Sequence, residues 1–509
     1  MNRTLLAACC VFVLSFFNDV SAETPNVIVI MADDLGYGDL SCYGATSVKT
    51  PHIDRLAAEG IRFTSGYCSA STCTPTRYSF LTGSYAFRRK GTGIAAPSAP
   101  AVISGGTTTV ASLLKTAGYQ TSVIGKWHLG LGGKDGPDWN GKLSPGPLEI
   151  GFDSCFLLPT TNDRVPQVYV KDHSVVNLDP ADPLWVGKKK PSDDHPTGRS
   201  HRDTLRMNWS HGHNGTIHNG ISRIGFYTGG QAARFRDEDL ADKWVEKSIE
   251  FIEANKEKPF FLFFASHDLH VPRMPHERFQ GKSDLGLRGD SIVQLDWCVG
   301  ELLNTLERLK IDDNTLVIFC SDNGPVLDDG YQDGALQKNG EHRSAGSYTG
   351  GKYSVYEGGT RTPFIARWPG RIKPDVSDAA VCTVDLAGSF AAMTETEIPS
   401  DACLDSLNIL DALLGNSPTG RDHIVQQNNG NSGTWGLRVG EWKLHRYDRK
   451  SARNVKVEQK LANTKVPRFR LFNLKHDPSE KTDVIKQHPK VAERLKKRLE
   501  KIIEDGRTR

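Results

Sequence analysis

The fold can be predicted from Asn26-Val27-Ile28-Val29-Ile30-Met31-Ala32, a run that leads directly into Asp33-Asp34. A nearly continuous apolar and β-branched run of this length is typical of a strand buried on both faces in a parallel sheet. Similar runs recur along the chain at Thr121–Ile124, Pro259–Ala265 and Thr315–Cys320. The sequence therefore predicts several buried strands of one sheet.

Segments with the apolar period of a helix separate these runs: His52–Glu59, Thr108–Ala117, Asp239–Ala254 and Ile292–Leu309. Alternating strands and helices favour an α/β fold, in which a large mixed, mostly parallel sheet is sandwiched by helices. In such sheets ligands bind at the carboxyl ends of the strands. Polar clusters follow most of the apolar runs, so we expect the functional site at that edge.

The second half of the chain changes character near Leu410–Arg421. Beyond that point Trp442–Tyr447 and Arg468–Leu474 are predicted strands, and Pro489–Ile503 is a predicted amphipathic helix. These elements indicate a smaller C-terminal α+β subdomain. We predict a catalytic domain over 23–420 and this subdomain over 421–509. Residues 163–230 lack periodicity, and long ordered loops of this kind are usually functional.

The net charge of the chain and its N-terminal residues restrict the possible functions further. The 63 basic and 60 acidic residues nearly cancel, so no global field favours nucleic acid or stable membrane association. An apolar stretch from Leu5 to Phe17 precedes Val20-Ser21-Ala22, which resembles a leader cleavage site. Residues 1–22 are therefore a predicted signal peptide. We expect a periplasmic or secreted protein, or a lysosomal or extracellular one in a eukaryotic host.

Two motifs carry the chemistry. Cys73-Thr74-Pro75-Thr76-Arg77 is followed by Thr82-Gly83, which gives the pattern C-x-P-x-R-x4-T-G. A cysteine of this kind alone is ordinarily a buried thiol or half of a disulfide. The second motif, Gly118–His128, ends in Lys126-Trp127-His128 after a predicted strand. Residues 126 and 128 point to the same side of an extended backbone.

With both motifs, the chain resembles the type I, formylglycine-dependent sulfatases of the alkaline-phosphatase-like superfamily. The resemblance extends from Asn26 to Leu471-Phe472-Asn473-Leu474 and Asp477-Pro478-Ser479-Glu480. It implies that a formylglycine-generating enzyme or an anaerobic sulfatase-maturating enzyme converts Cys73 to formylglycine (3-oxoalanine), whose hydrate is the nucleophile. It also implies roles for Arg77 at the hydrate, Lys126 in neutralising charge and His128 in taking a proton.

The acidic pairs indicate a metal site. Asp33-Asp34 and Asp322-Asn323 each follow a predicted strand and offer hard oxygen ligands, which suit Ca2+. In the family these positions bind calcium together with the oxygens of residue 73. Each pair taken alone is equally typical of helix caps.

The remaining site predictions concern the leaving group and the substrate. The resemblance selects His270, in His270-Val271-Pro272, as the acid for the leaving alkoxide, and Lys352 as a contact of the bridging oxygen. Five further residues are predicted to bind substrate: Asn162, Asp163, Arg164, His213 and Arg343.

We therefore expect an exported, calcium-dependent sulfatase that hydrolyses a sulfate monoester of a carbohydrate, such as a galactose or N-acetylgalactosamine sulfate of a sulfated glycan. Two alternatives remain. One is a phosphoesterase or phosphonate hydrolase of the same superfamily. The other is an inactive homologue that binds sulfated glycans, although no catalytic position is missing.

Overall fold

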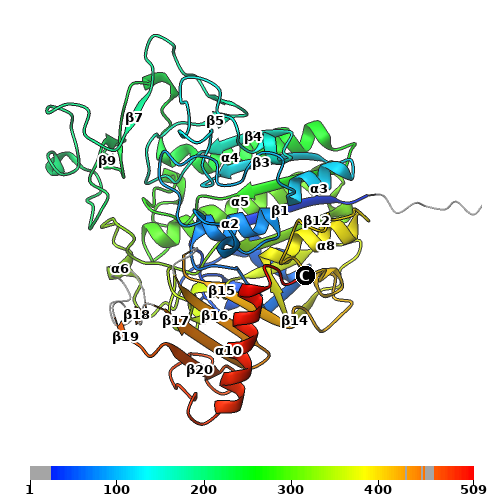
Figure 1. The fold of residues 1–509 in the computed structure, drawn as a ribbon. Helices are drawn as coiled ribbons and strands as arrows, with labels where there is room; N and C mark the ends of the chain where they lie inside the picture. Colours follow the sequence, from blue (N-terminus) through cyan, green and yellow to red (C-terminus); the bar gives the residue numbers. More distant parts are fainter. Residues whose placement is uncertain (1–23, 430–432, 449–450, 453–463) are drawn as a thin grey trace, which may run out of the picture.

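The fold is organised around a ten-stranded sheet in the order β14-β2-β13-β12-β1-β11-β3-β4-β5-β6 (Figure 1). The run from β12 through β1, β11 and β3 to β4 is parallel. β13 is antiparallel to both neighbours, β14 is parallel to β2, and β5 and β6 are antiparallel additions. The bounds are Asp375–Cys382, Ile61–Tyr67, Phe364–Arg367, Thr315–Ser321, Asn26–Ala32, Phe260–Ala265, Gln120–Lys126, Ser154–Leu158, Val170–Lys171 and Ser174–Val175 in that order. The predicted fold class is confirmed.

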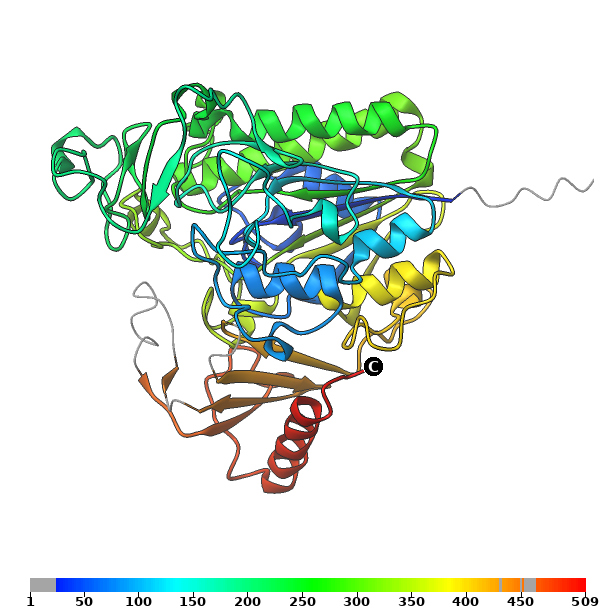
Figure 2. The same ribbon diagram turned by 45° about the horizontal axis from the view of Figure 1, so that its top comes forward.

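Helices cover both faces of this sheet. Val27, Val29 and Met31 of β1 pack into one apolar cluster with α2 (Cys73–Thr82), α3 (Val110–Thr116) and α8 (Leu386–Met393). The alternate residues Ile28 and Ile30 join a second cluster with α1 (Pro51–Ala58), α4 (Leu240–Asn255) and α5 (Leu287–Leu309). Figure 2 shows the green helices α4 and α5 on one side of the sheet and the blue α2 and yellow α8 on the other. Burial on two faces explains why β1 is apolar at every position.

The predicted elements match the observed ones closely, with differences at their ends. β1 has its predicted bounds, whereas α5 begins at Leu287 rather than Ile292. The first turn of α5 is polar but buried, because Arg288 donates two hydrogen bonds to Asp39 at 2.8 and 2.6 Å. An apolar period cannot reveal a turn that is held by a buried ion pair.

The aperiodic stretch 163–230 folds into short strands and loops. Besides β5 and β6 of the large sheet, its strands are β7 (Trp185–Gly187), β8 (Ile217–His218), β9 (Ile221–Ser222) and β10 (Phe226–Thr228). β7 pairs with β10, and Arg164 forms an isolated bridge with Ile224. The end of this stretch therefore lies beside its beginning.

The C-terminal part of the chain forms a separate antiparallel sheet in the order β15-β16-β17-β20 (Figure 1). Leu495 and Leu499 of α10 (Pro489–Glu504) pack on it, one helical turn apart. The sheet strands are His423–Gln427, Thr434–Val439, Trp442–Tyr447 and Phe469–Asn473, and the small pair β18-β19 is Ser451–Ala452 and Thr464–Lys465. Short helices α6, α7 and α9 span Ala335–Lys338, Glu357–Thr360 and Leu410–Leu413.

The computed structural model describes residues 24–429, 433–448, 451–452 and 464–509. The predicted signal peptide over 1–22 lies outside the described residues. Within the described part of the chain, no helix has both the length and the apolar character to cross a bilayer. The eight cysteines in these segments are all free thiols, including Cys73.

Truncating the central strand tests the two-sided core. Val29→Ala should lower the free energy of unfolding by about 2 kcal/mol, because Val29 is fully buried and the lost methyl groups leave a cavity. The matched change Val376→Ala, at an edge strand position that is 53% exposed, should cost less than about 0.5 kcal/mol. Urea unfolding of both variants measures the difference, and equal midpoints would contradict this account of the core.

Candidate active site

The site lies where adjacent parallel strands end. Asp33 and Asp34 follow β1, and Asp322 and Asn323 follow β12, whose Ser321 is in register with Ala32. The Asp322 amide donates to the Ala32 carbonyl at 3.0 Å, which continues the ladder one residue past the strand. Because the two strands are parallel neighbours, their polar ends meet at one edge of the sheet.

Three buried carboxylates converge there. Asp33, Asp34 and Asp322 each offer one oxygen, and these oxygens lie within 4.8 Å of one another. Burial, and then the neighbouring charge of Asp322, raise the pKa of Asp33 well above its usual value. Oδ1 of Asp33 and Oδ1 of Asn323 are buried and have no hydrogen-bond partner among the described residues. An oxygen-only donor set with two unpartnered oxygens fits a hard divalent cation.

Three buried cations partly offset this negative charge. Lys126, the last residue of β3, donates to Asp33. Arg77, one turn along α2 from Cys73, donates through Nε to Asp322 Oδ2 at 2.9 Å and through Nη1 to the Lys126 carbonyl at 2.9 Å. The Lys352 ammonium donates to Asp34 Oδ2 at 2.9 Å. Carboxylates and cations thus form one connected network, which orients every member.

Cys73 opens α2, and its thiol contacts a histidine. The Sγ atom of Cys73 lies 3.1 Å from Nδ1 of His128, while Nε2 of His128 lies 3.1 Å from the Ala95 carbonyl. A carbonyl can only accept, so Nε2 carries the proton and Nδ1 is the acceptor toward residue 73. Burial, followed by the charges of Arg164 and Lys126, holds the pKa of His128 well below its usual value. His128 is therefore a neutral base aimed at residue 73.

An unmodified thiol at this position is a poor nucleophile. Burial raises the pKa of Cys73, and this effect exceeds the opposing effect of Lys126. The thiolate is the reactive form of cysteine, so Cys73 stays protonated and inert near neutral pH. The surrounding charges are arranged for another chemical group at this position, or for an anion that binds beside it.

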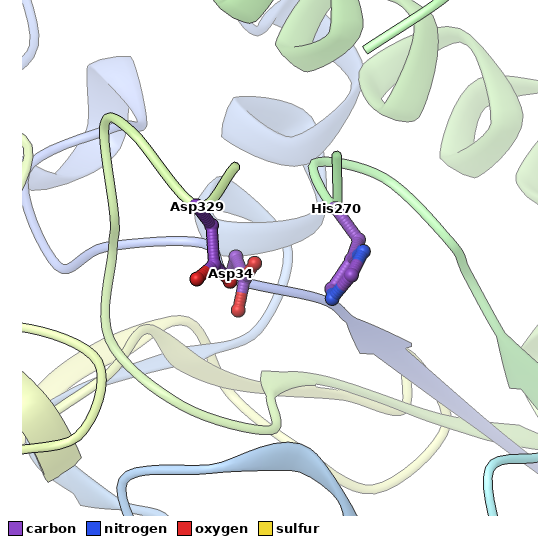
Figure 3. Close-up of side chains that lie close together, drawn as sticks. All are labelled: Asp34, His270 and Asp329. Atoms are coloured by element: carbon purple, nitrogen blue, oxygen red, sulfur yellow. The ribbon is translucent and has the colours of Figure 1, made fainter. Parts of the chain in front are cut away.

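His270 and Asp329 lie close to Asp34, as Figure 3 shows. Asp34, His270 and Asp329 each have a ligand atom within 4.8 Å of the others, and Lys352 also donates to Asp329 Oδ2 at 2.7 Å. Nδ1 of His270 lies 2.8 Å from the Val271 carbonyl, so Nδ1 bears a proton and Nε2 is free to contact a ligand. Burial, then Lys352 and Lys126, hold the pKa of His270 well below its usual value. Asp329 was not predicted from the sequence; the only signal was the acidic Asp328-Asp329-Gly330 turn after Asn323.

A polar cavity of about 240 Å³ opens onto these groups. Of the predicted substrate residues, Asp163, Arg164 and His213 line it. Asn162 is buried behind it and donates to the carbonyls of His270 and Pro272 at 3.3 and 3.0 Å, while Arg343 is exposed elsewhere. The full lining is Cys73, Ile94, Asp163, Arg164, His211, Gly212, His213, Ile224, His270, Asp329, Lys352 and Tyr353.

Mutual contacts hold the side chains at one end of the cavity. Asp163 accepts from Arg164 Nη1 at 3.0 Å and contacts His213 Nε2 at 2.9 Å. Burial opposes ionisation, but the charge of Arg164 and the hydrogen bond from His213 hold the pKa of Asp163 well below its usual value. The His213 ring in turn packs on Tyr331, with centroids 4.6 Å apart. Side chains fixed in this way are suited to read the hydroxyl pattern of a small polar ligand.

A polar cavity at the carboxyl ends of a parallel sheet, with Arg164 and Lys352 in its wall, suits an enzyme that binds a polar, anionic substrate. The Sulfatase family matches residues 25–396. An N-acetylgalactosamine-6-O-sulfatase of Bacteroides thetaiotaomicron is 49% identical over 485 residues, which is 95% of this chain and 94% of that protein. Arylsulfatase A of Homo sapiens is 32% identical over 435 residues, covering 85% and 76% of the two chains.

A solved structure, from work on glycosaminoglycan metabolism by Bacteroides thetaiotaomicron, has a TM-score of 0.92 and 48% identity to this chain. It covers 95% of this chain and is itself covered completely. The chain therefore belongs to the sulfatase family. It is a sulfuric ester hydrolase, which confirms the predicted family and enzyme class.

The acidic cluster predicts a measurable effect of cations on stability. Addition of Ca2+ after treatment with a chelator should raise the unfolding temperature, because a bound cation stabilises the folded state by linkage and relieves repulsion among three buried carboxylates. Asp322→Ala should abolish this increment. Asp313→Ala, an exposed residue just before β12, should retain it. Differential scanning calorimetry with and without Ca2+ makes the comparison, and an undiminished increment in Asp322→Ala would contradict the site.

Proposed function

We propose that the protein removes a 6-O-sulfate from an N-acetylgalactosamine or galactose unit of a sulfated glycan, with Ca2+ and with residue 73 as formylglycine. The observation that carries the proposal is the contact of Cys73 Sγ with His128 Nδ1 at 3.1 Å, beside the three carboxylates and at the base of the polar cavity. The choice of sugar comes from the name of the relative that is 49% identical.

The donor set supports calcium. Asp33, Asp34, Asp322 and Asn323 would hold the ion, and the side-chain oxygens of a modified residue 73 would complete its coordination. Formylglycine supplies a hydrate with two hydroxyls, one to attack sulfur and one whose deprotonation releases sulfate.

The residues around position 73 have complementary roles in this proposal. Arg77 and Lys126 neutralise charge on the nucleophile and the sulfate, and both are already oriented by carboxylates. His128 takes the proton whose loss releases sulfate, because its Nδ1 is an acceptor directed at residue 73.

His270 and Lys352 act on the leaving alkoxide. Nε2 of His270 is the free ring nitrogen, and the incoming sulfate adds negative charge that raises its affinity for a proton. Lys352 donates to Asp34 and Asp329 and stands at the cavity wall, from which it contacts the bridging oxygen. Together they stabilise the charge that develops as the bond to sulfur breaks.

Asp163, Arg164 and His213 bind the sugar ring in this proposal, since they line the cavity and are fixed by mutual hydrogen bonds. Asn162 acts indirectly, because it holds the His270 loop. Export through a signal peptide, maturation by a formylglycine-forming enzyme, and the division into 23–420 and 421–509 complete the proposal.

A substrate panel tests the reaction. The wild-type enzyme should release sulfate from N-acetylgalactosamine 6-sulfate at least about a hundredfold faster than from the 4-sulfate, and faster than it releases phosphate from the 6-phosphate. Cys73→Ala should lower turnover by more than about a thousandfold because it removes the nucleophile. Ion chromatography of released anions measures the rates. A mass spectrum of the peptide with residue 73 checks conversion to formylglycine, and preference for phosphate would rule out the proposal.

The two predicted substrate arginines should behave differently. Arg164→Ala should raise KM about tenfold or more, because Arg164 lines the cavity and orients Asp163. Arg343→Ala removes an exposed side chain that does not line the cavity, so KM should stay within about twofold. Steady-state kinetics on the best substrate measure both KM values. A larger increase of KM in Arg343→Ala than in Arg164→Ala would place the sugar site near Arg343 instead.

A further inference from the structure

The segment Asp477–Glu480 of the C-terminal part contacts the loop that carries Lys352. The Ser479 hydroxyl donates to the Ser347 carbonyl at 2.7 Å, and the Thr349 hydroxyl donates to the Ser479 carbonyl. Oε2 of Glu480 accepts from the Glu357 amide at 2.5 Å. These contacts join two parts of the chain that are far apart in sequence.

Glu480 is also the centre of a buried charge cluster. Its side chain is 2% exposed, and its Oε1 lies 2.7 Å from His445 Nε2 and 3.3 Å from Lys443 Nζ. Lys443 donates in turn to Glu357 Oε1 at 2.7 Å. Two carboxylates, one on each part of the chain, therefore share one buried ammonium. Interactions of this kind are strong because little water screens them.

Backbone contacts within the loop couple the position of Glu357 to that of Lys352. The Gly358 amide donates to the Thr349 carbonyl at 2.8 Å, which closes the loop at its base. A Cβ atom at Gly359 would lie 2.0 Å from the Ser354 carbonyl oxygen, so the two sides of the loop are in direct backbone contact. Within this tight turn Lys352 reaches Asp34 and Asp329 at 2.9 and 2.7 Å. A displaced Glu357 would therefore move the turn that aims the ammonium.

We propose that Glu480 is a positioning residue for Lys352, through which the C-terminal sheet and its following segment complete the active site. Glu480 does not line the cavity, so it acts indirectly: its segment holds the loop at Glu357 and, through the adjoining Ser479, at Thr349. The inference rests on the proposed function of Lys352 at the bridging oxygen. It goes beyond that function because it assigns a role in turnover to the C-terminal part of the chain.

A double-mutant cycle separates positioning from general stabilisation. Glu480→Gln should lower kcat about tenfold while KM stays within about twofold, since an error of a fraction of an ångström in a catalytic group is costly. In the background of Lys352→Ala, the same change should lower kcat by less than about twofold, because the ammonium that Glu480 aims is gone. Glu500→Gln, an exposed matched change on α10, should leave kcat unchanged in both backgrounds.

Two further measurements keep the test decisive. Each kcat is divided by the fraction of folded protein with modified residue 73, so losses of folding or maturation do not enter. Thr349→Val removes only the hydrogen bond from the hydroxyl to Ser479. It should lower kcat less than Glu480→Gln does, and again only while Lys352 is present. This variant keeps the test usable even if Glu480→Gln fails to fold. Equal losses in both backgrounds, or a Thr349→Val enzyme indistinguishable from wild type, would overturn the inference. Lys352→Ala alone tests the proposed function: an unchanged kcat there refutes the role of Lys352 independently of the cycle.

Discussion

Charge repulsion among Asp33, Asp34 and Asp322 governs how the site is built. Parallel pairing of β1 with β12 brings these carboxylates to one buried edge, where burial makes their charges costly. Three cations offset this negative charge, each by donating to a different carboxylate: Lys126, Arg77 and Lys352. In the proposed mechanism, the cations that neutralise the sulfate ester are the same ones that hold the carboxylates in place.

This arrangement also explains why the two histidines are held in defined tautomers. In each ring one nitrogen donates a hydrogen bond to a backbone carbonyl: Nε2 of His128 to that of Ala95, and Nδ1 of His270 to that of Val271. The other nitrogen of each ring carries no proton. Nδ1 of His128 faces residue 73, and the other such nitrogen, Nε2, belongs to His270, which lines the cavity. Burial and then nearby cations hold the pKa of both rings well below its usual value, so in the proposed mechanism each ring takes up a proton only when the substrate adds negative charge.

Several parts of the site could be predicted because local sequence determines them. A polar pair directly after a buried strand must lie at the sheet edge, and this rule is enough to place Asp33 and Asp322 together. Asp329 could not be predicted because it lies in a loop without periodicity. It is recognised as part of the site only through its hydrogen bond with Lys352, which forms in the folded structure. Arg343 stays a prediction: it is exposed and does not line the cavity, although it precedes Lys352 closely in the sequence.

Amino-acid order alone was sufficient for the strand–helix alternation and the family, because these depend on hydrophobic period and on motifs of residues close together in the chain. Which distant groups form hydrogen bonds with one another depended instead on tertiary packing. Examples are Asp163 with His213 within the aperiodic stretch 163–230, and Glu480 with Glu357 between the two sheets. Such pairings follow from how separately folded segments pack against one another, and no local pattern encodes that distance.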